Sequence, residues 1–346
     1  MAVAVAPARN PAGAVMGNGG PPPAPPFDQS TRLSLVKLAA ITRPVGGGIS
    51  PGLQLPTNGL LGGLLLKITG TIGGTVGAVN PLGFSSIVKR VTLTLNSGTV
   101  VFSMSGPGYH YIYRDWLDAG YVDCLGQSNG RTAITATGAV LDMYIPMQVN
   151  LRDPIGLLLL QNRQTTLTLG IEWEADVTVT ATGTFTSFQA VPYLLNYSVP
   201  PNPASLPPLR YIHQVLEDSR SQAAAGTITY DIPRGNTYMR IGHGCGIAVA
   251  GADSFTVAQL RVNQSNYIWN SDIGSQDMMF RILHGRARPP GVILYDFLGT
   301  SGLGSYGTTR DLYDSNRTTD FQSVVDPTGA LTFYTVREQL VDLKAA

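Results

Sequence analysis

Alternating hydrophobic and polar residues mark several short segments of the chain. Val91, Leu93 and Leu95 alternate with polar residues, and a period of two also runs through residues 167–173 and 177–180. This period places one side of an extended segment against a core and the other toward solvent, which predicts half-buried β-strands. Turns rich in glycine and proline separate the segments, and this arrangement favours a β-sandwich or jelly roll.

One segment in the first half of the chain has the period of a helix instead. Apolar residues recur at three- and four-residue intervals after Pro107, which suits the first turn of a helix. The pattern predicts a helix over 109–117 that ends near Gly120. The apolar face comprises Tyr109, Ile112, Tyr113, Trp116 and Leu117.

A second helix is predicted over 272–284. Ser271 or Asp272 can cap its N-terminus, and Gly285 suits its C-terminal end. Its apolar face comprises Met279, Ile282 and Leu283.

The second half of the chain repeats the order of segments in the first. Four pairs of segments match in sequence order: 55–68 with 232–241, the strand ending at Asn96 with the strand ending at Asn263, 161–169 with 315–323, and 182–197 with 328–343. In the last pair both segments start with Thr-Gly, and the alignment sets Leu194 against Leu340. Both helices follow their Asn residue by a similar distance. The repetition predicts two copies of one domain.

Two proline-rich segments set the expected domain boundaries. Residues 1–27 contain PPPAPP, and residues 199–208 read VPPNPASLPP; such segments neither continue a helix nor pair inside a sheet. We therefore expect an N-terminal arm over 1–27, a first jelly roll over 28–198, a linker over 199–209 and a second jelly roll over 210–346. The fold class is all-β, with two tandem jelly-roll β-sandwich domains and a short helix in each.

The charge content narrows the possible partners. Charged residues make up 13 % of the chain and the formal net charge is +1, whereas about 25 % charged residues is typical. A surface so poor in charge suits contact with other protein copies. Proteins that bind nucleic acid along its backbone carry a basic stripe. The sequence has none, so we expect no direct nucleic-acid binding.

The sequence offers no convincing set of residues for catalysis, a cofactor or a metal ion. Residues 302–307 match G-x-G-x-x-G, but no helix pattern follows, so a glycine-rich turn is favoured over a dinucleotide site. His243 and Cys245 lack further ligands at suitable spacing. Glu172, Glu174 and Asp176 are expected on one strand face, where a solvated or intersubunit role is favoured over acid–base catalysis.

Neither a membrane span nor a secretory signal is expected. Residues 59–79 have the length of a span, but Lys67 and many Gly and Thr residues fit strands better. The N-terminus lacks a charged region followed by an uninterrupted apolar run.

The order of these segments resembles a known family. The most telling stretches are YDIPRGNTYMRI at 230–241, DSFTVAQLRVNQS at 253–265, GVILYDF at 291–297, RDLYDSNRTTDFQ at 310–322 and FSSIVKRVTLTLNSG at 84–98. Together with the two helices, they resemble the double jelly-roll major capsid proteins of tectivirus-like, membrane-containing icosahedral bacteriophages. The resemblance covers about residues 30–343 and is one of order and spacing.

This resemblance implies a structural role without catalysis. Members of the family form homotrimers that act as pseudo-hexagonal capsomers and tile an icosahedral shell around an internal lipid membrane. The expected partners are further copies of the chain, penton or vertex proteins, minor capsid proteins and the internal membrane. The expected location is the virion capsid, after assembly in the host cytoplasm.

Two other functions stay open at this stage. A secreted β-sandwich protein that binds carbohydrate or acts as an adhesin would need a signal peptide and often an aromatic platform. Trp116, Trp173 and Trp269 instead fall inside predicted elements. A sandwich-fold hydrolase would need a catalytic set.

Residues 30–43 carry the prediction about the membrane. Ser30 or Thr31 could cap a short helix with an apolar face. Arg32, Lys37 and Arg43 add positive charge without a nearby acid, so the segment could lie on anionic lipid. The alternative is that Leu33, Leu35 and their neighbours form a strand that packs under the first roll, with the charges solvated.

Overall fold

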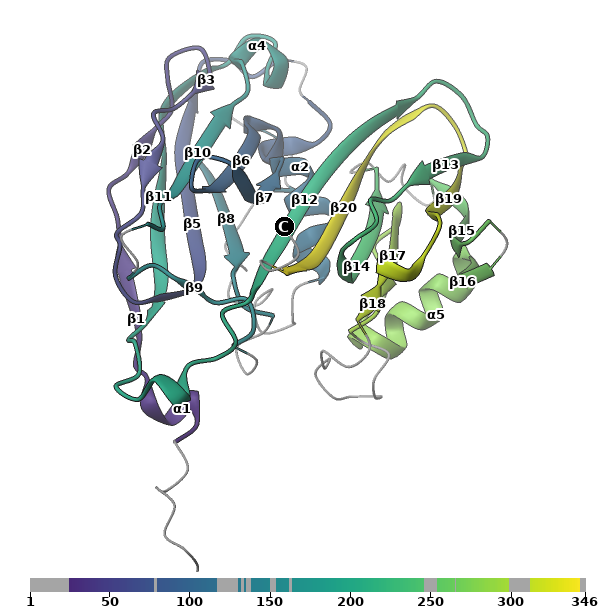
Figure 1. Cartoon of the computed structure of the whole chain (residues 1–346). Helices are drawn as coiled ribbons and strands as arrows, with labels where there is room; N and C mark the ends of the chain where they lie inside the picture. Colours follow the sequence, from purple (N-terminus) through teal and green to yellow (C-terminus); the bar gives the residue numbers. More distant parts are fainter. Residues whose placement is uncertain are drawn as a thin grey trace, which may run out of the picture.

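The chain folds into two β-sandwiches that lie side by side (Figure 1). The computed structural model describes residues 25–77, 80–116, 130–131, 134, 138–149, 154–161, 164–245, 254–264, 266–298 and 312–342. The predicted all-β fold with two tandem jelly rolls is confirmed. The predicted boundaries at 28–198, 199–209 and 210–346 stay a prediction.

The first roll consists of two facing sheets. One sheet has the order β1 (Leu33–Lys37), β11 (Thr184–Tyr197), β5 (Leu60–Gly73) and β8 (Gly138–Pro146), with β2 (Ile41–Thr42) on β11 and β9 (Leu158–Leu159) on β5. The other has the order β7 (Thr99–Met104), β6 (Val88–Leu95), β10 (Leu167–Trp173) and β3 (Gly48–Ile49), with β4 (Leu53–Gln54) on β10.

The second roll repeats this arrangement. One sheet has the order β12 (Tyr211–Gln222), β20 (Leu331–Asp342), β14 (Thr237–Gly244) and β17 (Val292–Asp296), with β18 (Tyr313–Asp314) on β14. The other has the order β16 (Asn266–Asp272), β15 (Phe255–Val262), β19 (Phe321–Pro327) and β13 (Ile228–Asp231). Each strand of the second roll therefore has a counterpart at the same place in the first.

The hairpins β6–β7 and β15–β16 correspond residue by residue. Both turns start at an asparagine in the left-handed region, Asn96 with φ 50° and Asn263 with φ 50°, a conformation that asparagine tolerates well. Each asparagine Oδ1 accepts a hydrogen bond from a residue just before the neighbouring strand of the sheet: from the N–H of Thr166 before β10 (2.9 Å) or of Thr319 before β19 (2.8 Å). Each hairpin also shifts register once, at the same distance from its turn. The predicted match of Asn96 with Asn263 is confirmed.

The closing strands β11 and β20 correspond in place, but not in the predicted register. The pairing of β5 with β11 shifts at Gly62, and that of β14 with β20 shifts at Met239. Aligning these two shifts sets Leu195 against Glu338, and hence Leu194 against Arg337. The alignment of Leu194 with Leu340 was wrong because both segments are apolar at many positions, so a register error of three residues still matched apolar with apolar.

The helices occupy the same position in both rolls. The first forms α2 (Gly106–Tyr111) and the 3₁₀ turn η2 (Tyr113–Trp116), and the second forms α5 (Ile273–His284). Tyr109, Ile112 and Tyr113 are buried as predicted. The side chain of Trp116, together with Leu117 and Gly120, lies outside the described residues.

Helix α5 has its predicted caps but a different buried face. Asp272 is the N-cap and Gly285 the left-handed C-cap. Gln276 and Phe280 form the buried face, whereas Ile282 is exposed. The prediction for Ile282 was wrong because Ile282 lies two residues after the buried Phe280, which places it on the other side of the helix. Met279 and Leu283 are partly buried.

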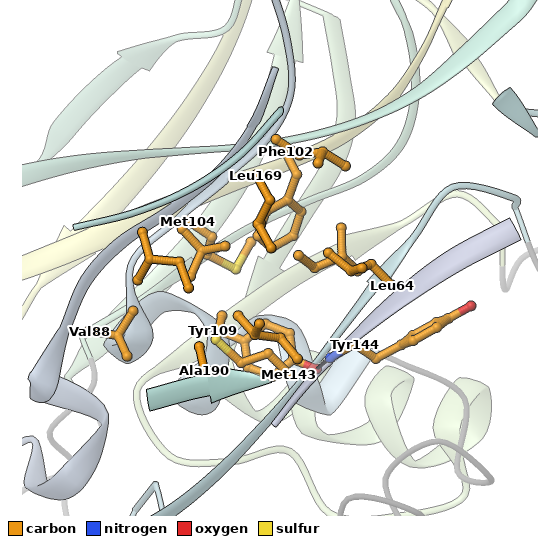
Figure 2. Close-up of a cluster of buried hydrophobic side chains, with 14 of the residues drawn as sticks. Leu64, Val88, Phe102, Met104, Tyr109, Met143, Tyr144, Leu169 and Ala190 are labelled. Carbon is orange, nitrogen blue, oxygen red and sulfur yellow. Dashed lines mark hydrogen bonds between the residues drawn. The ribbon is translucent and has the colours of Figure 1, made fainter. Parts of the chain in front are cut away.

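The core of the first roll lies between its two sheets (Figure 2). Side chains from both sheets meet there, among them Leu64, Phe102 and Leu169, with Tyr109 of α2 closing one end. The Tyr109 hydroxyl accepts a hydrogen bond of 2.5 Å from the N–H of Tyr144. This buried polar group is thereby satisfied, as a closed apolar core requires.

Three further segments can be compared with the sequence expectations: 59–79, 177–180 and the linker. Leu60–Gly73 of the 59–79 stretch form strand β5, as favoured. No described helix is long and apolar enough to cross a bilayer. Residues 177–180 were expected as a strand, but Asp176–Val179 form the one-turn helix α4. The linker contains the 3₁₀ turn η3 (Pro203–Ser205). The remaining short elements are α1 (Phe27–Ser30), η1 (Gly83–Ile87) and η6 (Ser315–Arg317).

Candidate assembly surfaces

The two rolls are joined edge to edge inside the chain. Strand β7 of the first roll pairs in parallel with β12 of the second, with Phe102 opposite Val215 and Ser103 opposite Leu216. The apolar core of the first roll continues across this junction into residues of the second: Ile212, Val215, Phe280, Val292, Leu294 and Val336. The junction therefore buries apolar surface from both rolls.

A buried carboxylate ties the N-terminus of α2 to the second roll. The Ser105 hydroxyl caps α2 by accepting a hydrogen bond from the N–H of Gly108 (3.0 Å). The N–H and hydroxyl of Ser105 each donate to Oε2 of Glu217 on β12, at 2.9 Å. Burial raises the pKa of Glu217 to about 6, against the opposing effect of these hydrogen bonds.

A chain of charged side chains lines the same junction. Glu338 on β20 accepts hydrogen bonds from His213 (2.9 Å), Arg240 (2.9 Å) and the hydroxyl of Tyr113 in the first roll (3.3 Å). Arg240 also contacts Asp296 at 3.3 Å. Burial opposes ionisation of Glu338, but the charge of Arg240 and the hydrogen bond from His213 outweigh it and hold the pKa of Glu338 below its usual value.

The equivalent edges at the outer ends of the chain are open among the described residues. Strand β1 pairs with β11, and β16 pairs with β15. They lie on opposite sides of the molecule (Figure 1). Apolar side chains are exposed on both: Leu33 (51 %), Leu35 (58 %) and Val36 on β1, Tyr267 on β16, and Met278 and Ile282 on the adjoining α5. Exposed apolar groups on open sheet edges mark interaction surfaces.

The three predicted membrane-facing residues have different surroundings. The predicted helix over 30–43 was wrong, since residues 33–37 form strand β1 and α1 ends at Ser30. The strand alternative was right, but Leu33 and Leu35 are exposed and do not pack under the roll.

Arg43 is not free to contact lipid. Its side chain is 3 % exposed and forms an ion pair of 2.5 Å with Asp176. The expectation that it lacked a nearby acid failed because Asp176 is distant in sequence and is brought close by the fold. The side chains of Arg32 and Lys37 are exposed.

The three carboxylates expected on one strand face do not share one. Strand β10 ends at Trp173, so Glu174 and Asp176 lie beyond it, and Asp176 begins α4. Glu172 contacts Lys89 at 2.7 Å. No two of these three carboxylates are therefore held together on one strand face, as acid–base catalysis would require.

His243 and Cys245 belong to the interior of the second roll. The ring of His243 is hydrogen-bonded to Thr335 (2.9 Å) and Ser323 (2.7 Å) and is fully buried, which lowers its pKa to about 3. Cys245 is buried and contacts Ser254 at 3.1 Å. The described residues include no group of three or more His, Cys, Asp and Glu side chains that could hold a metal ion. Residues 302–307 lie outside the described part.

One hollow in the described part of the chain lies beneath α5. It is lined in part by Trp269 and Phe280 and has a cavity volume of about 10 Å³, far below the range of about 300 Å³ and more of typical ligand pockets. Trp173 is buried, and its indole N–H donates to Ser50 at 2.7 Å. Trp173 is therefore no part of an aromatic binding platform.

The residues of the junction were missed from the sequence. Glu217 and Glu338 lie in strand segments that contain further polar residues, and no spacing distinguishes them from solvated carboxylates. The only available signal was the presence of Glu217 in RYIHQVLEDSR and of Glu338 in TVREQL. A repeat of two domains would place these two strands where the domains meet.

Comparisons with known proteins identify the fold. No family model matches the sequence, and no curated protein matches it. The structure is similar to that of the major capsid protein of STIV, Sulfolobus Turreted Icosahedral Virus, with a TM-score of 0.64 and 12 % identity over 90 % of this chain and 97 % of the other.

Two more solved structures agree. The similarity to VP54 of PBCV-1 has a TM-score of 0.63 and 10 % identity, and covers 90 % of this chain and 94 % of VP54. The similarity to the major capsid protein P2 of bacteriophage PM2 has a TM-score of 0.50 and 12 % identity, and covers 90 % of this chain and 98 % of P2. The resemblance to double jelly-roll major capsid proteins is thus confirmed for the fold: the chain has the two-roll architecture of viral major capsid proteins.

Proposed function

We propose that this chain is the major capsid protein of an icosahedral virus with an internal membrane, and that it is not an enzyme. Three copies would form a pseudo-hexagonal capsomer, and capsomers would tile the shell. The observation that carries the proposal is the repeated strand order of the two rolls, since two equivalent rolls per chain supply six similar units in a trimer. The shared fold with viral major capsid proteins supports it.

The surface chemistry supports the same role. The charged fraction is low, and apolar side chains are exposed at both outer edges. We expect the virus to be a bacteriophage whose capsid assembles in the host cytoplasm. Vertex and minor capsid proteins are the expected further partners. We also take 28–198 and 210–346 as the two rolls, flanked by the arm (1–27) and the linker (199–209).

The oligomeric state tests this function directly. Light scattering of the purified protein should give about three times 36.7 kDa, and electron microscopy of concentrated protein should show hexagonally packed particles. A monodisperse monomer at micromolar concentration, with no ordered arrays, would exclude the capsid role.

The membrane contact is a separate part of the proposal. Arg32 is the residue that we assign to this contact, because it is exposed and directly precedes β1 at the end near the arm. Lys37 is also exposed but ends β1 on the side away from the arm, and Arg43 is removed by its burial. Near the arm, Pro25 accepts a hydrogen bond from Ser205 (2.7 Å), and Phe27 contacts the ring of Tyr197. We expect this end to face the membrane, so Arg32→Gln should weaken binding of the trimer to anionic vesicles at low salt. Unchanged binding would exclude Arg32 from that contact.

A further inference from the structure

The contact between the two rolls inside the chain defines a contact between chains. Within one chain, the β7 edge of the first roll meets the β12 edge of the second. The counterparts of these edges, β16 and β1, pair with no further strand of the described part of the chain and lie at opposite sides of the molecule (Figure 1). Because the rolls are equivalent, β16 of one copy can meet β1 of the next in the way that β7 meets β12.

The register of the sheets fixes which residues of β1 correspond to the junction residues of β12. Glu338 pairs with Val215, and its counterpart Leu195 pairs with Leu35. Continuing along the strands, Val36 corresponds to Leu216 and Lys37 to Glu217. Leu35 and Val36, the exposed apolar pair of β1, therefore correspond to Val215 and Leu216, the two residues of β12 that pair with β7.

The hairpins fix the other side of the contact. Counting from the equivalent Asn96 and Asn263 turns, with the register shift at the same place in each, Phe102 corresponds to Trp269 and Ser103 to Asn270. The same count sets the N-cap of α2, Ser105, against the N-cap of α5, Asp272. This agreement of strands and caps supports the correspondence independently of sequence similarity.

We propose that β1 of one copy pairs in parallel with β16 of the next, with Leu35 and Val36 opposite Trp269 and Asn270, and with Lys37 in an ion pair with Asp272. The hydrogen bond from Ser105 to Glu217 inside the chain is thus replaced by a salt bridge between chains. Inside the chain the pair is a neutral donor, Ser105, and an acid, Glu217. Between chains the equivalent positions hold an acid, Asp272, and a base, Lys37. This charge complementarity commits the occupant of the β1 edge to a second copy of the chain.

The side chains at both edges are available for this pairing. Oδ1 of Asp272 accepts the N–H of Ser275 (2.7 Å), and Asp272 is exposed. Lys37 is exposed as well. Tyr267 and Ile282 extend the apolar surface beside the β16 edge.

The contact joins unlike edges, so it can be repeated. A heterologous contact of this kind forms a ring when its rotation closes and a filament when it does not. The rotation that carries one roll onto the next is the same inside a chain and between chains. Six rolls therefore close the ring when this rotation is a sixth of a turn. The number three rests on the proposed capsomer, whereas the pairing of β1 with β16 rests on the register above.

A reversal and rescue of charge tests the pairing. Lys37→Glu places two acids together and should raise the concentration at which trimers dissociate on the order of tenfold in low salt, since three exposed ion pairs are reversed. Lys37→Glu combined with Asp272→Ser recreates the Glu217–Ser105 pair and keeps an N-cap, so it should return dissociation to near the wild-type concentration. Arg234→Glu, the same kind of charge change at an exposed residue between β13 and β14, away from both edges, should have no effect.

The outcomes separate this inference from the proposed function. A wild-type trimer with dissociation unchanged by Lys37→Glu, or a double variant no better than Lys37→Glu alone, overturns the pairing and leaves the capsid role intact. A wild-type protein that stays monomeric overturns the capsid role itself. Equal thermal unfolding midpoints of all variants, measured by circular dichroism, establish that each chain is folded.

Discussion

The two rolls share their strand order but differ in chemistry at equivalent positions of their sheets. In the second roll, Glu338 and Arg240 form a buried ionic network against the first roll. Their counterparts in the first roll are Leu195 and Gly63. The second roll meets one fixed partner within the chain, whereas the first roll presents an apolar edge. Duplication thus kept the topology, while each edge became adapted to the surface it meets.

Breaking the buried network should have the largest effect on stability. Glu338→Leu gives the second roll the residue of the first, but it removes the acceptor of His213 and Tyr113 and leaves Arg240 with Asp296 alone. Removing one member of a buried pair costs about 3–5 kcal/mol, so the unfolding midpoint in denaturant should fall steeply. The double variant Glu338→Leu/Arg240→Leu should recover part of the loss. A Glu338→Leu protein as stable as wild type would contradict the role given to the network.

A charge in the apolar β1 edge should have the next largest effect, on assembly. Leu35→Asp places a carboxylate where Leu35 would meet β16, so trimers should dissociate at concentrations at least about a hundredfold higher, given about 2–3 kcal/mol for the lost apolar burial alone. Sedimentation or light scattering measures this change. Val177→Asp is the matched control, because Val177 is 81 % exposed but lies on α4, away from both edges. Equal dissociation of the two variants would remove β1 from the interface.

The acid at the junction should make stability depend on pH. The pKa of Glu217 is raised from 4.5 to about 6 in the folded chain, so the folded state binds the proton more tightly than the unfolded state. Wild type should therefore lose stability as pH rises from 4.5 to 6, by on the order of 2 kcal/mol, and no further above pH 6. Glu217→Gln removes this dependence. Its stability relative to wild type should rise over that pH window, as measured by denaturant unfolding at each pH; parallel pH profiles would contradict the prediction.

The turn asparagines should give the smallest effect and the closest agreement between rolls. Asn96→Ala loses one side-chain hydrogen bond and Asn263→Ala loses two, both from Thr319, and each places alanine at a positive φ. Each should therefore cost about 1–2 kcal/mol of unfolding free energy. Replacing either asparagine with glycine should avoid the part of this loss in unfolding free energy that comes from the positive φ, since glycine adopts it without strain. Costs that differ by more than about 1 kcal/mol between the rolls would show that the two turns are not equivalent.

The sequence was sufficient for the fold because its signals are local and occur twice. Alternation located β6 and β10, caps located α5, and repeated order established the two rolls. Register was less accessible: the closing strands are apolar at many positions, and only the shifts at Gly62 and Met239 align them.

Contacts between distant segments were not accessible at all. Arg43 and Asp176, or Ser105 and Glu217, are far apart in sequence and meet only when the sheets form. Residues 30–43 were also ambiguous, because a short apolar segment with interspersed charges fits both a helical and an extended pattern. Pairing with β11 decided for the strand.

The pairing of β7 with β12 also bears on the order of synthesis. While the first roll leaves the ribosome, β7 is an open edge beside an unfinished core, which is a site for aggregation. The first strand made after the linker is β12, the strand that covers this edge. At about 5–20 residues per second, translation supplies β12 within seconds of the end of β11. The strand order of the chain therefore keeps short the period in which a nascent first roll could pair with a neighbouring one.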